Sequence, residues 1–287
     1  MHILKLFGFY NRTEFALHLS TDMCSTTGDL EEYVTKYLEG SSNLSLLLDY
    51  DGTLTPIVAH PDLATIPPET KDVLERLSQI PEIFVAIISG RAVDNVKSMV
   101  GVDTITYAGN HGLEVLYPDG SRYNHQLPSN FDDQLKELIA KLEKKVVRDG
   151  AWIENKGSTL TFHYRATPEP LKETIRQEAE KIIQEANFKI GKAHMAIEVR
   201  PKVEWNKGSI ALLLLEKKYG NNWNKETKVI FIGDDTTDED AMKALKGNAA
   251  TFRIAKCDAM KTNAEKIISS TDNVIEILKL VDKYFKK

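Results

Sequence analysis

The sequence predicts an α/β fold in which a parallel sheet carries a separate α+β module inserted into its middle. Short apolar, β-rich runs alternate with amphipathic stretches toward both ends of the chain, which is typical of βα units. The middle of the chain differs, because residues 159–164 alternate polar and apolar side chains. A sheet with one solvated face has that pattern. The 287 residues are enough for one large domain or two modest ones.

Apolar runs and helix signals define the expected parallel sheet. Five runs are expected to form its buried strands: residues 44–48, 83–88, 104–108, 229–232 and 249–254. Four helices are expected beside them: residues 68–78, 209–219, 238–245 and 272–286. Pro68 is well placed in a first helical turn, and Gly220 is a good C-cap for the helix before it.

The inserted module is expected over residues 112–200. Residues 113–117 and 123–127 flank Pro118-Asp119-Gly120-Ser121, a turn signal that predicts a hairpin. The module's other expected elements are helices at 131–147 and 169–186 and strands near 152, at 159–165 and at 195–200. The core is therefore predicted to comprise residues 41–111 and 201–287. Residues 1–40 form an N-terminal extension to which the sequence assigns no role.

Composition excludes several classes of protein. The 37 basic and 42 acidic residues give a net charge of −5 with no long basic run, so neither a nucleic-acid nor a membrane partner is expected. Two cysteines, Cys24 and Cys257, argue against a disulfide scaffold or a cysteine-built zinc site. No apolar stretch approaches the ~20 residues that span a bilayer. The apolar start is too interrupted for a signal peptide, so a cytoplasmic protein is expected.

Two carboxylates follow the first expected strand directly. Asp49 and Asp51 come at its carboxyl end, where open α/β sheets place their active sites. Gly52 and Thr53 then let the chain turn away and leave both acids accessible. The alternative is a calcium loop or a solvated turn, but the longer acidic ladder of an EF-hand is missing.

A second acidic cluster follows the strand expected at 229–232. Five of the eight residues from Gly233 to Asp240 are acidic, and a bound cation is the simplest explanation for placing so many like charges together. Hard oxygen ligands at two strand ends suit Mg²⁺. Capping of a helix start explains some of these acids, but it does not require Asp234. The sequence does not decide whether Asp235 or Asp238 assists it.

Two further segments have the chemistry of phosphate binding. Ser89 and Gly90 follow the strand at 83–88 and offer a hydroxyl and backbone N–H groups. Lys207 begins the helix before the strand at 229–232, a position unfavourable for a cation unless a phosphate lies nearby. Each segment alone is also compatible with an ordinary loop or a solvated charge.

In this order, the four segments resemble the haloacid dehalogenase superfamily of phosphotransferases. The resemblance implies a Rossmann-like parallel-sheet core, with Asp49 as nucleophile and Asp51 as general acid/base. It also implies phosphate binding by Ser89 and Lys207. Magnesium is then expected on the Asp49 and Asp234 carboxylates and the Asp51 carbonyl. Between Ser89 and Lys207 lie 117 residues, which is the superfamily's second position for a cap that covers a small-molecule substrate.

Further motifs resemble the trehalose-6-phosphate phosphatase family over about residues 44–280. They are the stretches from Asp49 to Ile57, from Ile88 to Arg91, Gly109 to Gly112, Glu154 to Gly157, Glu198 to Pro201 and Gly233 to Asp240. The resemblance implies hydrolysis of trehalose 6-phosphate to trehalose and phosphate. Polar residues expected near the sugar are Arg91, Asn110, His111, Glu114, Glu154, Lys156, Glu198 and Arg200. His111 is also compatible with a turn, and Glu198 with Arg200 with a structural ion pair.

Other functions remain compatible with these residues. The nearest alternative is a phosphatase for sucrose, glucosylglycerol or hexose phosphate. A phosphomutase would return phosphate to a sugar hydroxyl. A non-catalytic regulatory subunit would tolerate loss of Asp49, Asp51 or Lys207, which are all present. The expected partner is a small-molecule sugar phosphate, with a trehalose-phosphate synthase as a possible protein partner.

Overall fold

The computed structural model describes residues 27–286 apart from 59, 194 and 257–260. Within these residues, eight strands form the larger sheet: β1 (Leu44–Leu48), β2 (Ile83–Ile88), β3 (Thr106–Gly109), β4 (Glu114–Leu116), β5 (Arg122–Asn124), β10 (Lys228–Gly233), β11 (Ala250–Ile254) and β12 (Lys266–Ile268). Their spatial order is β12-β11-β10-β1-β2-β3-β4-β5. The strands from β12 to β3 are parallel, while β4 and β5 run antiparallel. The predicted α/β fold with a parallel sheet is confirmed.

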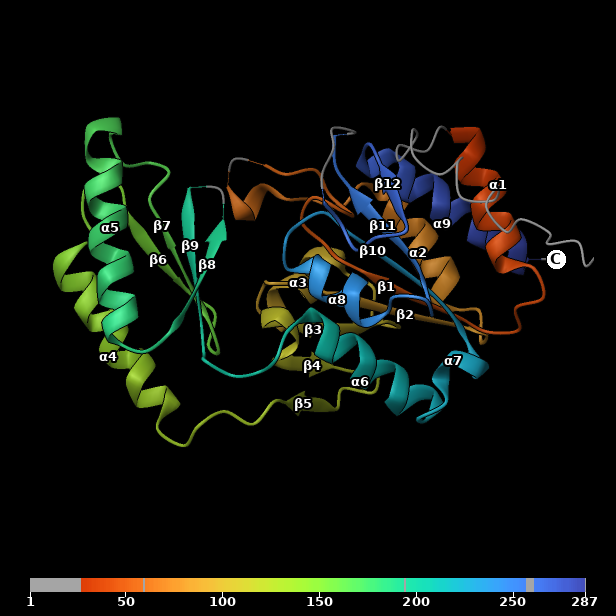
Figure 1. The fold of residues 1–287 in the computed structure, drawn as a ribbon, viewed down its shortest axis with the longest axis horizontal. Coiled ribbons are helices and arrows are strands. Elements are labelled where there is room, and N and C mark those ends of the chain that lie inside the picture. The colour runs from red at the N-terminus through yellow and green to blue at the C-terminus, as the bar shows by residue number, and fades with distance from the viewer. Residues whose placement is uncertain (1–26, 59, 194, 257–260, 287) are drawn as a thin grey trace, which may run out of the picture.

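Helices cover both faces of the larger sheet (Figure 1). One face carries α1 (Thr27–Leu38), α2 (Pro68–Ser78), α3 (Val93–Val100) and α9 (Thr271–Phe285). The other carries α6 (Lys207–Tyr219), α7 (Trp223–Glu226) and α8 (Asp238–Ala244). Leu46 of β1 joins the first core and Leu47 the second, because successive side chains of a strand point to opposite faces. Burial on both faces explains the continuous apolar runs.

The smaller sheet lies apart from the larger one, with its own helices on the outer side (Figure 1). It contains β6 (Trp152–Asn155), β7 (Leu160–His163), β9 (Ala196–Arg200) and β8 (Lys189–Ala193), in that order and antiparallel throughout. Helices α4 (Phe131–Lys145) and α5 (Glu169–Glu185) bury a third apolar cluster against it. Leu160 and Phe162 belong to that cluster, so Thr161 and His163 project from the opposite face.

Two parts of the structure differ from the expected organisation. The hairpin expected in the insert extends the larger sheet instead, since β4 pairs with β3. The N-terminal residues 27–38 form a helix whose Leu30, Val34 and Leu38 are buried in the main core, because their i, i+4 spacing places them on one face. The rest of the predicted extension, residues 1–26, lies outside the described residues, as do Cys24 and Cys257. In the described part of the chain, no helix is both long and apolar enough to cross a bilayer.

Candidate active site

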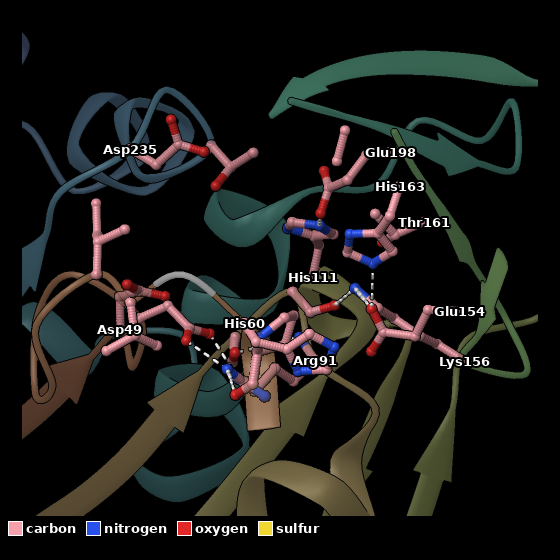
Figure 2. A pocket seen from close by; sticks show the side chains of 18 of the residues that line it. Asp49, His60, Arg91, His111, Glu154, Lys156, Thr161, His163, Glu198 and Asp235 are labelled. Carbon is pink, nitrogen blue, oxygen red and sulfur yellow. Dashed lines mark hydrogen bonds and ion pairs between the residues drawn. The ribbon is translucent and has the colours of Figure 1, made fainter. Parts of the chain in front are cut away.

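A cavity of about 570 Å³ lies between the carboxyl ends of the central parallel strands and the smaller sheet. Among the expected site residues, those that line it are Asp49, Asp51, Ser89, Gly90, Arg91, His111, Glu154, Lys156, Glu198, Lys207, Asp234 and Asp235. We call the residues from the larger sheet and its loops the core side, and those of β6, β7 and β9 with Lys156 the insert side. Figure 2 shows Asp49 and Asp235 across the cavity from Glu154, His163 and Glu198.

Lys207 is the centre of charge on the core side. Its Nζ donates to Asp49 Oδ1 at 2.6 Å and to Asp238 Oδ1 at 2.8 Å, and its side chain is only 3% exposed. Asn206 caps α6 by accepting from the backbone N–H of Ser209, which fixes the start of the helix and hence Lys207. Burial alone would lower the pKa of Lys207, but the two carboxylates raise it above its usual range.

Three acids meet around this lysine. Asp49, Asp234 and Asp238 each offer a carboxylate oxygen, and these atoms all lie within 4.8 Å of one another. Burial, with the neighbouring acids, raises the pKa of Asp49 above its usual range against the pull of Lys207, and raises that of Asp234 to about 7. Gly52 makes the approach possible, because a Cβ there would lie 2.1 Å from Asp234 Oδ2.

This donor set fits the expected Mg²⁺. Carboxylate oxygens are the hard ligands that Mg²⁺ prefers, and a divalent cation would offset the repulsion that raises the pKa of Asp49 and Asp234. Both carboxylate oxygens of Asp238 already accept hydrogen bonds. Oδ1 accepts from Lys207 Nζ, and Oδ2 accepts from the backbone N–H of Asp235 at 3.0 Å. Asp238 is fully buried and does not line the cavity, so it can orient Lys207 and the loop. Both oxygens of Asp49 also accept hydrogen bonds, from Lys207 and Thr53, but Asp49 and Asp234 line the cavity.

Asp51 faces away from the acidic cluster and pairs with Arg91. The guanidinium donates to both carboxylate oxygens, Nη2 to Oδ1 at 2.6 Å and Nε to Oδ2 at 2.7 Å. Burial alone would lower the pKa of Arg91, but the hydrogen bonds and charge of Asp51 raise it. Arg91 also donates to the carbonyl of Pro61. The sequence did not predict this pair, which keeps the Asp51 side chain out of the acid cluster.

Ser89 and Gly90 form a tight corner after β2. The hydroxyl of Ser89 accepts from the backbone N–H of Arg91 at 3.2 Å, and a Cβ at Gly90 would lie 2.8 Å from His111 Cε1. The backbone N–H of His111 in turn donates to Ser89 O. Only glycine therefore permits the ring of His111 to close over this corner.

Two polar contacts link the corner to the insert side. His111 Nε2 lies 2.9 Å from Glu198 Oε1, and Lys156 Nζ donates to Gly90 O at 3.3 Å. Burial alone would raise the pKa of Glu198, but the charge and hydrogen bond of His111, with Lys156, hold it well below its usual range. His111 Nδ1 is buried with no hydrogen-bond partner among the described residues.

Three of the residues expected at the sugar site do not line the cavity. Asn110 donates to Glu114 Oε1 and to the carbonyl of Lys156, so it joins the two sheets. Glu114 also accepts from Ser158. Arg200 lies beside Glu198, with Nε 3.8 Å from Oε2. Asn110 and Glu114 therefore hold the junction between core and insert, whereas Arg200 pairs with a residue of its own strand.

Several cavity residues were not predicted, among them His60, Trp152, Thr161 and His163. His163 Nε2 bonds Glu154 Oε2 at 3.0 Å, and its ring stacks on Trp152. The polar and apolar alternation of residues 159–164 placed Thr161 and His163 on the non-core face of their strand. It gave no sign that this face closes over an active site.

The comparisons with known proteins agree with this site. The family model described as trehalose-phosphatase matches residues 47–274. Probable trehalose-phosphate phosphatase 4 of Oryza sativa subsp. japonica is 31% identical over 265 residues, which cover 90% of this chain and 71% of its own. The C-terminal domain of C. albicans trehalose-6-phosphate phosphatase superposes with a TM-score of 0.74 at 24% identity, over 88% of this chain and 97% of that one.

The fold and the position of the acids define the class of protein. A haloacid dehalogenase-like hydrolase from Bacteroides thetaiotaomicron has the same fold, with a TM-score of 0.58 at 16% identity over 83% of this chain and 99% of that one. This likeness shows that the chain has the same class of α/β fold. More narrowly, the chain belongs to the trehalose-phosphatase family, and it is a phosphoric monoester hydrolase.

Proposed function

We propose that the chain hydrolyses trehalose 6-phosphate to trehalose and inorganic phosphate, with Mg²⁺ as cofactor and Asp49 as nucleophile. The observation that carries the proposal is one cavity that brings Asp49, Lys207 and Asp234 opposite a polar sheet face. The three charged side chains suit a phosphoryl group, and the polar sheet face suits a sugar. The family's name supplies the particular sugar phosphate.

Asp49, Asp234 and the backbone carbonyl of Asp51 are the residues that would hold Mg²⁺, with Asp238 and Asp235 as support. When bound, the ion neutralises charge on the phosphoryl oxygens and on the acids. Lys207 adds a fixed positive charge 2.6 Å from the nucleophile, which lowers the repulsion between Asp49 and a dianionic phosphate.

The first step transfers the phosphoryl group to Asp49. A carboxylate oxygen of Asp49 attacks phosphorus, and the bond from phosphorus to the sugar 6-oxygen breaks. Asp51, in its protonated form, gives its proton to that oxygen. Arg91 must release Asp51 for this step, and its guanidinium is then available to bind the phosphate.

The second step returns the enzyme to its starting form. A water attacks the phosphorus of the Asp49 acyl phosphate, Asp51 takes its proton, and the bond between phosphorus and Asp49 breaks. In its ion pair with Arg91, Asp51 is ionised. The ionised carboxylate is the form that can accept a proton from water. Ser89, Gly90 and Lys207 bind the phosphoryl oxygens in both steps.

The smaller sheet with α4 and α5 is proposed to act as a lid over residues of the core. Glu154, Lys156 and Glu198 project from it toward the core and offer directional hydrogen bonds to sugar hydroxyls. Closing such a lid excludes water from the transfer step. The junction at Asn110, which contacts Lys156 O at 2.9 Å, lies where the lid meets the core.

The experiment is a phosphate-release panel with the purified chain. We expect trehalose 6-phosphate to be hydrolysed faster than sucrose 6-phosphate, glucosylglycerol phosphate and glucose 6-phosphate, and chelation followed by added Mg²⁺ to abolish and restore release. Faster hydrolysis of another sugar phosphate would overturn the proposed substrate assignment. An isomerised sugar phosphate in place of free phosphate would indicate a mutase. A cytoplasmic location and a trehalose-phosphate synthase partner stay predictions.

A further inference from the structure

The cavity face of the smaller sheet presents its side chains in two rows across three strands. Pairing aligns Glu154 of β6 with Thr161 of β7, and Thr161 with Glu198 of β9. The same pairing aligns Trp152 with His163 and His163 with Ala196. All six residues line the cavity. The first row is polar, and the second is dominated by two stacked rings.

The two rows lie at different distances from the corner formed by Ser89 and Gly90, where the phosphoryl group is proposed to bind. Lys156, two residues beyond the polar row on the same stretch of chain, donates to Gly90 O. Glu198, within the polar row, bonds His111, whose ring covers Gly90. Two residues along a strand advance about 6.6 Å. The ring row is therefore one further step from the corner, a distance comparable with the width of a sugar ring.

Trp152 is well supported on the insert side. Its ring lies 4.1 Å from that of His163 with an interplanar angle of 10°, and Glu154 holds His163 through the bond at 3.0 Å. The other ring beside Trp152 is that of His60, which packs less closely because the two ring centroids are 5.8 Å apart. His60 comes from the core loop before the 3₁₀ turn Pro61–Leu63, and its side chain is 49% exposed. It can move aside for a ligand.

We infer that Trp152 is a specificity-determining residue that binds the sugar ring remote from the phosphate. This rests on the proposed function and deepens it. The face of a pyranose ring presents C–H groups with partial positive charge, and these pack on the negative face of an indole. The polar row is then left to the hydroxyls of the phosphorylated ring. A monosaccharide phosphate reaches only the polar row, so the ring row favours disaccharide phosphates.

The test compares kcat/KM for trehalose 6-phosphate with kcat/KM for glucose 6-phosphate. In Trp152→Ala we expect this ratio to fall roughly 10- to 100-fold, whereas Trp152→Phe, which keeps a flat ring, retains most of it. Trp223→Phe is the matched control, because Trp223 is buried between α7 and the larger sheet, away from the cavity. An unchanged ratio in Trp152→Ala, or an equal loss on both substrates, would overturn the inference.

A second readout does not depend on turnover. Trehalose alone should change the tryptophan emission of the wild type and of Trp223→Phe, and the change should vanish in Trp152→Phe. If the wild type hydrolysed no disaccharide phosphate, the proposed function would fail, and this titration would still decide the role of Trp152. An emission change that persists in Trp152→Phe would refute it.

Discussion

The two sides of the cavity are built in different ways. On the core side, the side chains of Lys207 and Asp49 are 3% and 6% exposed; Lys207 begins helix α6, and Asp49 follows the parallel strand β1. On the insert side, Glu154 and Glu198 are 28% and 19% exposed and project from antiparallel strands. Buried fixed charges suit the phosphoryl chemistry that every substrate shares. A more exposed, polar sheet face suits the recognition of one particular sugar as leaving group. Mutations on the core side are therefore expected to lower activity on all substrates, and mutations on the insert side to change the preference among substrates.

The largest effect is expected at the nucleophile. Asp49→Asn removes the attacking carboxylate and should lower kcat by a factor of about 10⁴ or more, on trehalose 6-phosphate and on p-nitrophenyl phosphate alike. Phosphate release at saturating substrate measures it. Asp133→Asn makes the same change on the exposed surface of α4 and should have full activity. Near-normal turnover of Asp49→Asn would refute its role.

The next largest effect is expected at Lys207. Lys207→Met keeps the length of the side chain but removes the charge that contacts Asp49 and Asp238, so kcat should fall by about 10²–10³ on both substrates. Mg²⁺ should bind more tightly to the variant, since a neighbouring positive charge is lost. Magnesium titration by calorimetry, beside steady-state kinetics, checks both statements. Weaker Mg²⁺ binding would show that Lys207 organises the acids and that its charge is secondary.

A smaller and selective effect is expected on the insert side. Lys156→Met removes a donor that lines the cavity and contacts the Gly90 carbonyl, and KM for trehalose 6-phosphate should rise about tenfold, the value of one charge-assisted hydrogen bond. Kinetics on p-nitrophenyl phosphate should stay close to those of the wild type. Equal losses on both substrates would contradict the division of labour between the two sides.

The smallest effect is a pH-dependent change in stability. The pKa of Glu198 is held below its ordinary value of 4.5, so its ion pair stabilises the folded state above about pH 4.5 and loses that effect as the pH falls. The melting temperature of Glu198→Gln should lie below that of the wild type at pH 7, by roughly 2–4 °C for each kcal/mol lost. The gap should narrow at pH 4. A gap that widens on acidification would refute the assignment.

The core side could be predicted from the sequence because its residues follow their strands directly. Asp49 and Asp234 come immediately after β1 and β10, which are neighbours in the sheet, so a local motif determines their meeting. The pairing of Asp51 with Arg91 was not predicted, since it depends on how two loops fold back toward each other.

The insert side could be predicted only in part. Glu154 and Glu198 were identified by resemblance, but Trp152 and His163 join the cavity through the register between β6 and β7, which no local pattern specifies. The hairpin was placed in the wrong sheet because its turn residues predict a hairpin but do not specify which sheet its strands join; β4 pairs with β3 of the larger sheet. Helix α3 and strands β8 and β12 were not predicted either, because they are short.

The central claim is that Asp49 carries the phosphoryl group between the two steps. Rapid acid quench during turnover of trehalose 6-phosphate, followed by peptide mass spectrometry, tests it most directly. We predict one added phosphoryl group on the peptide that contains Asp49, and none in Asp49→Asn. Full turnover with no phosphorylated peptide, or with the label on another residue, would contradict the account.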